Sequence, residues 1–149
     1  MHLRSLLMFF FIPIQTLAIA SSPVIAGSSD ICTFTKPTDG NLVTNTTMPT
    51  KLESFSAVGG LPTRISVSCH QPVQLTVSAP IQVAGPAFNP VSSLAIVESP
   101  TGRSTNSRSN ATLPLPVGTT PLLINLSVDK GSLLKPGNYK YGVRFSIVP

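Results

Sequence analysis

The chain has 149 residues, of which only 10% are charged, and its formal net charge is +5 at pH 7. This length is typical of one domain, and the basic residues are scattered without a run of Lys or Arg, so nothing favours nucleic-acid binding. Pro, Ser and Thr are frequent, and no long stretch has the 3.6-residue periodicity of an amphipathic helix, which indicates a β-rich protein.

The N-terminal residues have the pattern of a secretory signal peptide. Arg4 gives a positive start, and residues 6–20 carry no charge. This apolar run is shorter than the roughly 20 residues that a membrane-spanning helix needs. Two short motifs with small residues suited to signal-peptide cleavage follow, one that ends at Ala20 and one that ends at Ala26. We expect residues 1–26 to be a signal peptide, which leaves no stable membrane span after cleavage.

The rest of the chain, residues 27–149, is expected to form one exported domain, in the periplasm, on the outer cell surface or outside the cell. Cys32 and Cys69 are its only cysteines. An even pair in an exported domain predicts a disulfide, which on the chain-entropy model stabilises the fold by about 3–4 kcal/mol. The alternative, a reactive thiol, requires a neighbouring base and a protected site.

Alternating apolar and polar residues predict strands along most of this domain. Residues 63–69 and 73–79 both alternate, so we expect them to form a hairpin or an adjacent pair. Residues 51–60 are a further strand candidate that ends at a pair of glycines. Other runs that favour strands are 31–43, 81–83, 93–98 and 120–128. About seven short strands at this spacing predict an all-β, antiparallel β-sandwich.

Prolines are expected between these strands, where they remove no ladder hydrogen bond: Pro80, Pro86, Pro90, Pro100, Pro114, Pro116, Pro121 and Pro136. One stretch, residues 99–112, is uniformly polar, has almost nothing to bury, and carries Arg103 and Arg108. We interpret it as a mobile hairpin loop, because surface loops are commonly polar. The alternative is a surface contact loop in which the two arginines meet a partner or an anionic surface.

The C-terminal stretch has the clearest strand pattern in the chain. Apolar residues occupy every second position: Tyr139, Tyr141, Val143, Phe145 and Ile147. We expect these side chains to face the core, and Lys140, Arg144 and Ser146 between them to face outward or toward a sheet edge. No later strand follows in the sequence, so the edge of this closing strand is expected to be uncovered.

The sequence gives no reason to expect an enzyme, a cofactor or a metal site. His70 is the only histidine of residues 27–149 and directly follows Cys69, so on a strand the two side chains point to opposite faces. Residues 132–135 match S-x-x-K, but the companion motifs of penicillin-binding enzymes are absent. The acidic residues have no spacing that selects a catalytic pair.

Residues 135–149 resemble the C-terminal signature of the spore coat protein U family and related secreted pilin-like subunits. In that pattern a Pro/small-Gly-x-Tyr turn leads into an alternating final strand, carried here by Gly137, Tyr139, Val143, Phe145 and Ile147. One cysteine near the mature N-terminus and another at the end of an early strand are also similar to chaperone–usher pilins, in which such a disulfide ties the first strand to the second.

This resemblance implies an incomplete immunoglobulin-like sandwich that lacks its last strand. A periplasmic chaperone, and then a neighbouring subunit, supplies the missing strand by β-strand addition. The implied function is that of an exported structural or adhesive protein without catalysis. Polymer subunit, terminal subunit and self-standing surface protein are alternatives within this class. A different class is a small periplasmic or extracellular β-sandwich whose loops bind a ligand.

Overall fold

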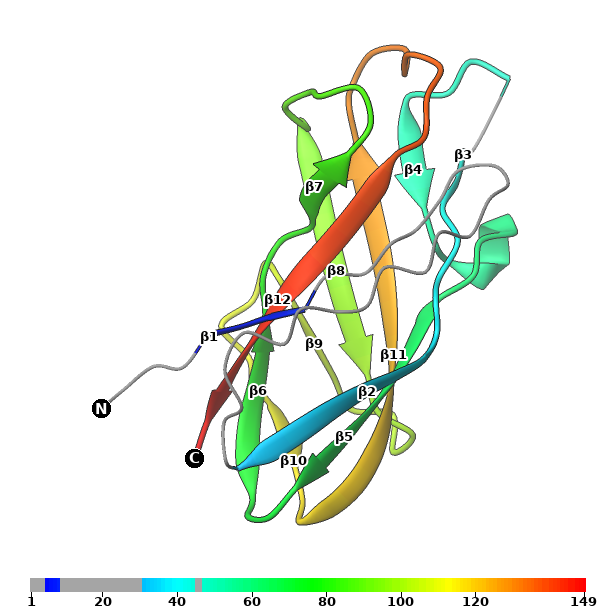
Figure 1. Ribbon diagram of the computed structural model, residues 1–149. Helices are drawn as coiled ribbons and strands as arrows, with labels where there is room; N and C mark the ends of the chain where they lie inside the picture. The colour runs from blue at the N-terminus through cyan, green and yellow to red at the C-terminus, as the bar shows by residue number, and fades with distance from the viewer. Residues whose placement is uncertain (1–4, 9–30, 45–46) are drawn as a thin grey trace.

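The computed structural model describes residues 5–8, 31–44 and 47–149. Apart from Ser5–Met8, the predicted signal peptide lies outside the described residues. Figure 1 shows strands packed in two layers, and every strand pair is antiparallel. One 3-10 turn, η1 (Ser56–Val58), is the only helical element in the described part of the chain. The prediction of an all-β, antiparallel sandwich is therefore confirmed.

The first sheet is built around the closing strand. Its order is β1 (Ser5–Met8), β12 (Lys140–Val148), β6 (Val73–Val77) and β10 (Leu113–Leu115), and β7 (Ile81–Ala84) pairs with the first residues of β12. β6 and β7 thus pair with successive parts of β12, and β1 pairs with Val143–Ser146.

The second sheet is built around the long strand β11 (Gly118–Asp129). Its order is β2 (Cys32–Thr38), β5 (Thr63–Cys69), β11, β4 (Lys51–Glu53) and β3 (Val43–Thr44). On its other edge β11 pairs with β8 (Ser92–Glu98), which in turn pairs with β9 (Ser104–Asn106).

The core lies between the two sheets and is filled by the alternate positions that the period-two pattern predicts. All five alternating residues of the closing stretch are buried: Tyr139, Tyr141, Val143, Phe145 and Ile147. Arg144 is exposed, and Lys140 and Ser146 are half-buried. The prediction for the closing strand is confirmed, because only one face of it meets the opposite sheet.

The predicted pairing of residues 63–69 with residues 73–79 is wrong. β5 pairs with β2 and β11, whereas β6 pairs with β12 and β10 in the other sheet. The short segment 70–72 therefore crosses between the layers. Alternation shows which face of a strand is buried but carries no information about its neighbour, and both strands bury the expected residues on opposite sides of the core.

The prediction of one strand over residues 51–60 is also wrong. Only Lys51–Glu53 is a strand, and the chain then leaves the sheet through η1. Gly59 ends this turn with a φ of 87°, a left-handed conformation that glycine adopts without strain. Ser54 holds the departure point, because its hydroxyl accepts a hydrogen bond from the Leu126 N–H at 2.7 Å.

Two of the prolines expected between strands lie within strands. Pro114 is in β10, which is the last strand of its sheet. Pro121 is in β11, at a position that pairs with Ser66 on one edge and lies before the start of the β8 pairing on the other. At both places one edge of the strand has no partner among the described strands. A proline can therefore occupy the position, because no ladder hydrogen bond is lost on that edge.

Candidate functional site: the second edge of the closing strand

The closing strand has one edge paired within the sandwich and one edge paired with residues from the predicted signal peptide. On the first edge, the Arg144 N–H donates to the Ser78 hydroxyl at 2.9 Å, and the Ser78 N–H donates to the Arg144 carbonyl at 2.9 Å. Since successive residues of a strand direct their backbone groups to opposite edges, those of Val143 and Phe145 face the second edge.

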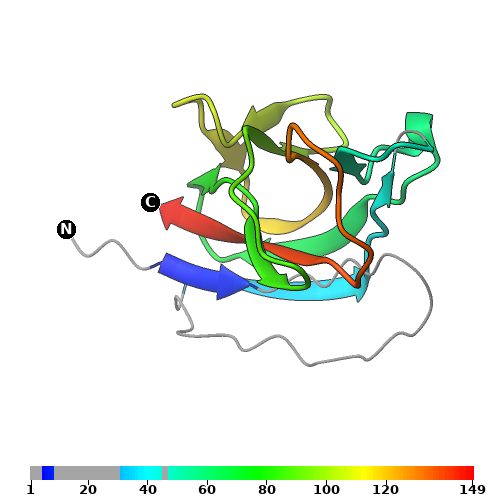
Figure 2. The same ribbon diagram turned by 90° about the horizontal axis from the view of Figure 1, so that it is seen from above.

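That second edge is where β1 lies. Leu6 pairs with Phe145, and Met8 pairs with Val143, in antiparallel register. Figure 2 shows β1 at the end of the first sheet, beside β12. The expectation that no strand covers this edge is therefore wrong, because the strand that pairs with it comes from the opposite end of the chain.

Beneath this edge, the two sheets meet through a pair of aromatic rings. Phe34 of β2 stacks on Phe145, with ring centroids 5.7 Å apart and an interplanar angle of 10°. β2 is itself the end strand of its sheet, because β5 is its one partner among the described strands. Phe34 was not singled out in the sequence, although its place two residues after Cys32 on an alternating strand gives it the same inward direction.

The disulfide lies on this same end strand. Cys32 and Cys69 are bonded, and they are directly opposite each other in the β2–β5 register. The predicted pairing is confirmed, and the bond fastens β2, the end strand among those described, to β5, which lies between β2 and β11. A disulfide is usual in oxidising compartments and is consistent with an exported protein.

The turn before β12 is fixed by Tyr139. Its hydroxyl donates to the Lys135 carbonyl at 2.6 Å, and its ring contacts Phe88 edge-on, with centroids 6.0 Å apart. Gly137 is required by packing, because a Cβ there would lie 2.6 Å from Cδ of Pro86. The two residues that carry the resemblance in this turn thus have structural roles.

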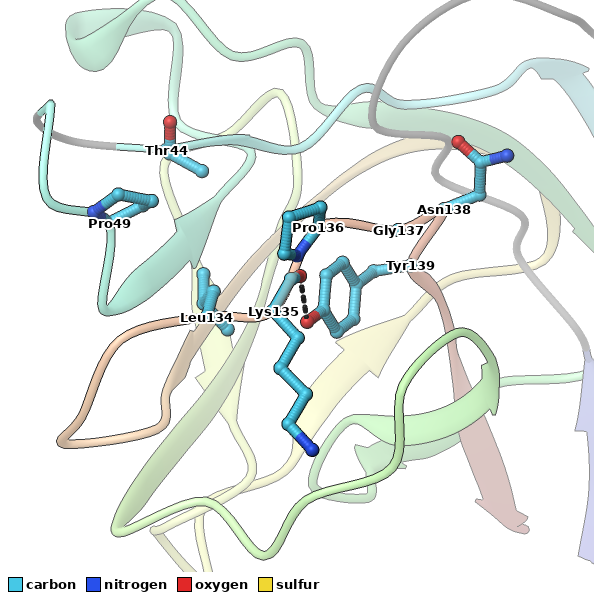
Figure 3. Close-up of a pocket in the computed structure, with 8 residues that line it drawn as sticks. All are labelled: Thr44, Pro49, Leu134, Lys135, Pro136, Gly137, Asn138 and Tyr139. Atoms are coloured by element: carbon cyan, nitrogen blue, oxygen red, sulfur yellow. Dashed lines mark hydrogen bonds between the residues drawn. The ribbon is translucent and has the colours of Figure 1, made fainter.

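A pocket with a volume of about 320 Å³ lies at this turn, and Figure 3 shows the residues that line it. Its lining residues are Thr44, Pro49, Leu134, Lys135, Pro136, Gly137, Asn138 and Tyr139. Tyr139 is 2% exposed, so its ring forms part of the wall and offers no open aromatic face to a ligand. Burial raises the pKa of the Tyr139 hydroxyl.

Tyr141, two residues further on, is buried, and its hydroxyl has no hydrogen-bond partner among the residues that the structure describes. Burial raises the pKa of this hydroxyl strongly, and the neighbouring Tyr139 adds to the effect. A buried hydroxyl without a hydrogen bond lowers the stability of the fold. The Tyr139 hydroxyl therefore stabilises the fold, whereas the Tyr141 hydroxyl destabilises it.

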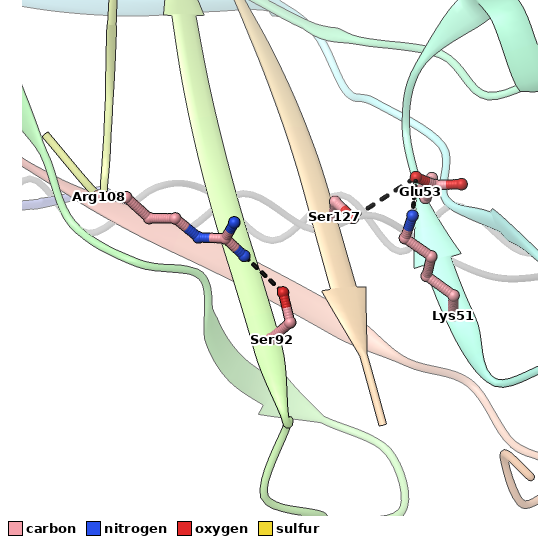
Figure 4. A network of polar contacts seen from close by, with 5 residues as sticks. All are labelled: Lys51, Glu53, Ser92, Arg108 and Ser127. Carbon is pink, nitrogen blue, oxygen red and sulfur yellow. Dashed lines mark hydrogen bonds and ion pairs between the residues drawn. The ribbon is translucent and has the colours of Figure 1, made fainter. Parts of the chain in front are cut away.

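The two arginines of the predicted contact loop have different environments. The Arg108 guanidinium donates to the Ser93 carbonyl at 3.0 Å and to the Ser92 hydroxyl, which holds it against β8 (Figure 4). Arg103 is exposed near the turn that follows β8. Neither belongs to the β12 edge, and their role as a contact surface stays a prediction.

The same polar stretch contains structure that its composition did not indicate. Thr105 is 2% exposed, and its hydroxyl donates to the Ala111 carbonyl at 2.6 Å within the β8–β9 region. The expectation of almost nothing to bury is therefore wrong for this residue.

A second polar cluster in Figure 4 joins β4 to β11. The Glu53 carboxylate lies 2.8 Å from the Lys51 ammonium group and accepts a hydrogen bond from the Ser127 hydroxyl at 3.5 Å.

Among the described residues, no three His, Cys, Asp or Glu side chains gather in a way that would hold a metal ion. No helix in the described part of the chain is long and apolar enough to cross a membrane. Comparison with protein-family models, with curated proteins and with solved structures finds no match for this chain.

Proposed function

We propose that this chain is an exported structural or adhesive, pilin-like protein without catalytic activity, which accepts a β-strand along β12. The observation that carries the proposal is the pairing of Val143–Ser146 with Ser5–Met8. Ser5–Met8 lies within the predicted signal peptide, so cleavage after Ala20 or Ala26 would remove the strand that covers this edge.

Removal of β1 would have two physical consequences. The backbone groups of Val143 and Phe145 would lose their strand partner, and an exposed edge of this kind promotes association with other strands. The place that β1 occupies beside Phe145 would also be left open, and burial of an apolar side chain there is worth about 1.5–3 kcal/mol. Both effects favour a replacement strand from another polypeptide.

The partner that fits is an extended segment with alternating apolar residues, because backbone pairing supplies affinity and alternate side chains reach the core. A periplasmic chaperone and a neighbouring subunit are the two sources that the resemblance implies. The turn before β12 supports an immunoglobulin-like arrangement. The Tyr139 hydroxyl bonds to the backbone four residues upstream, as in the tyrosine corner of immunoglobulin domains.

Amide hydrogen exchange on the secreted domain, residues 27–149, tests the proposal. We expect the amides of Val143 and Phe145 to exchange fast and those of Arg144 and Ser146, which face β6, to exchange slowly. A peptide with the sequence of residues 3–10 is then added. It should slow exchange at Val143 and Phe145 and raise the melting temperature, because a ligand that binds only the folded state stabilises it.

The control is a peptide of the same composition in scrambled order, which should change neither property. The proposal fails if the domain is monomeric, protects Val143 and Phe145 as well as Arg144 and Ser146, and gains no stability from the peptide. That result would identify a sandwich that is complete without a donor.

The second candidate is a small periplasmic or extracellular ligand-binding module, which the pocket in Figure 3 favours. Its volume of about 320 Å³ is at the lower end of the range for small-molecule sites. Native mass spectrometry of the secreted protein separates the two candidates, because a binding module should retain a small molecule after purification. A subunit that accepts strands should instead retain a polypeptide.

A further inference from the structure

A second pocket lies on the outer face of the other sheet. It has a volume of about 350 Å³ and is formed where β5, β11 and the end of β8 lie side by side. Leu122 and Ile124 of β11 face the core, so Leu123 between them faces outward. Leu123 is nevertheless half-buried, which shows that neighbouring residues form walls around it.

Three prolines line this pocket around Leu123. Pro121 lies two positions before Leu123 on the same face of β11, and Pro37 and Pro100 line the pocket from β2 and from the turn after β8. Pro37 is part of an irregularity in the β2–β5 register between Thr35 and Thr38. Rigid proline rings around a leucine give a preformed apolar floor at little cost in conformational entropy.

Two opposite charges flank this floor. Leu123 pairs with Arg64 on one side and with Glu98 on the other, so the three residues form one row across the sheet. With a strand spacing of about 4.7–5.5 Å, the charged side chains begin about 10 Å apart. Within the described part of the chain, neither the Arg64 guanidinium nor the Glu98 carboxylate makes a hydrogen bond or an ion pair.

We propose that this pocket binds a small ω-amino carboxylic acid, a molecule with a carboxylate at one end of an apolar chain and an ammonium group at the other. The carboxylate pairs with the Arg64 guanidinium, the ammonium group pairs with the Glu98 carboxylate, and the methylene chain lies over Leu123 and the prolines. A zwitterion satisfies both charges at once, whereas an apolar molecule leaves both unpaired and a singly charged one leaves one.

The probe is 6-aminohexanoate, titrated into the purified, disulfide-bonded protein and followed by NMR chemical shifts. We expect saturable binding with the largest shifts in residues around Leu123. Hexanoate and hexylamine each satisfy one charge and should bind at least about tenfold more weakly, as should 6-aminohexanoate to R64Q or E98Q. A hydrogen bond to a charged group contributes about 1.5–3 kcal/mol.

Charge reversal provides the sharpest test. R64E and E98R should each abolish binding, because both ends of the pocket then carry the same charge. The double variant R64E/E98R should restore binding, with the ligand reversed. R103Q, which neutralises an exposed arginine outside the pocket, is the matched control and should bind like the unmodified protein.

Binding that persists in both single reversals, shifts that map elsewhere, or no saturation overturns the proposal. So does a double variant that folds, shown by an unchanged circular-dichroism spectrum, and yet does not bind. The pocket is on a different sheet from β12, so none of these outcomes affects the proposed strand acceptance.

Discussion

Replacement of Phe145 by alanine tests the packing beneath the β12 edge. Phe145 is 0% exposed, and its ring stacks on Phe34. Truncation of a buried Phe costs about 3–5 kcal/mol, of which the aromatic pair accounts for about 0.5–1.5 kcal/mol beyond the buried area. A domain of this size is stable by about 5–15 kcal/mol, so F145A removes a large part of the total.

The assay is urea denaturation of the disulfide-bonded protein, with thermal unfolding as a second measurement. A loss of about 3–5 kcal/mol corresponds to a fall of about 10–25 °C in melting temperature. Arg144 is exposed on the same strand, so R144A is the matched control and should change stability by about 0.5 kcal/mol or less.

A double-mutant cycle isolates the ring contact. F34L and F145L, made singly and together, should give a coupling energy of about 0.5–1.5 kcal/mol. Equal stability losses in F145A and R144A would refute the assignment of this face of β12 to the core, and a coupling energy of zero would refute the aromatic contact.

The remaining predictions concern the disulfide and the two tyrosines. Unreduced protein should have a mass two hydrogens below that of the dithiol form, and a variant with serine at Cys32 and Cys69 should lose about 4 kcal/mol of unfolding free energy. Y139F removes the hydroxyl that donates to Lys135 and should lower the free energy of unfolding by about 0.5–1.5 kcal/mol. Y141F removes a buried hydroxyl that has no partner among the described residues, and should leave this free energy unchanged or raise it. Urea denaturation measures both changes. Burial raises both pKa values above the ordinary value of 10.0. The unfolded chain therefore loses these protons first, and the unfolding free energy should fall as pH rises above about 10, less steeply in Y141F.

The sequence predicts which face of a strand is buried better than it predicts which strands pair with each other. The inward positions of β12 follow from alternation, because one face of the strand is buried against the other sheet. The partners of β5 and β6 do not follow, since two consecutive strands with the same pattern form either a hairpin or a crossing between sheets. Thr105 has no signal in a polar stretch, and only the fold places its hydroxyl beside the Ala111 carbonyl.

The features around β12 could be predicted from the sequence, whereas the pocket on the other sheet could not. The disulfide and the turn with Gly137 and Tyr139 have short-range patterns that can be read directly. The row of Arg64, Leu123 and Glu98 brings together residues far apart in the chain, and their register depends on how β5 and β8 pair with β11. Nothing in the local sequence of any of the three marks it as part of a pocket.

The position of the disulfide also determines how the domain would carry mechanical load. Cys32 and Cys69 are 37 residues apart in sequence, and their bond closes this segment into a loop that tension on the chain ends cannot extend. In single-molecule pulling, reduction of the bond should lengthen the fully stretched domain by about 120–130 Å. An oxidised domain pulled through its ends therefore has a maximum extension that is shorter by the length of this loop, and the redox state of one bond sets how far the domain can stretch.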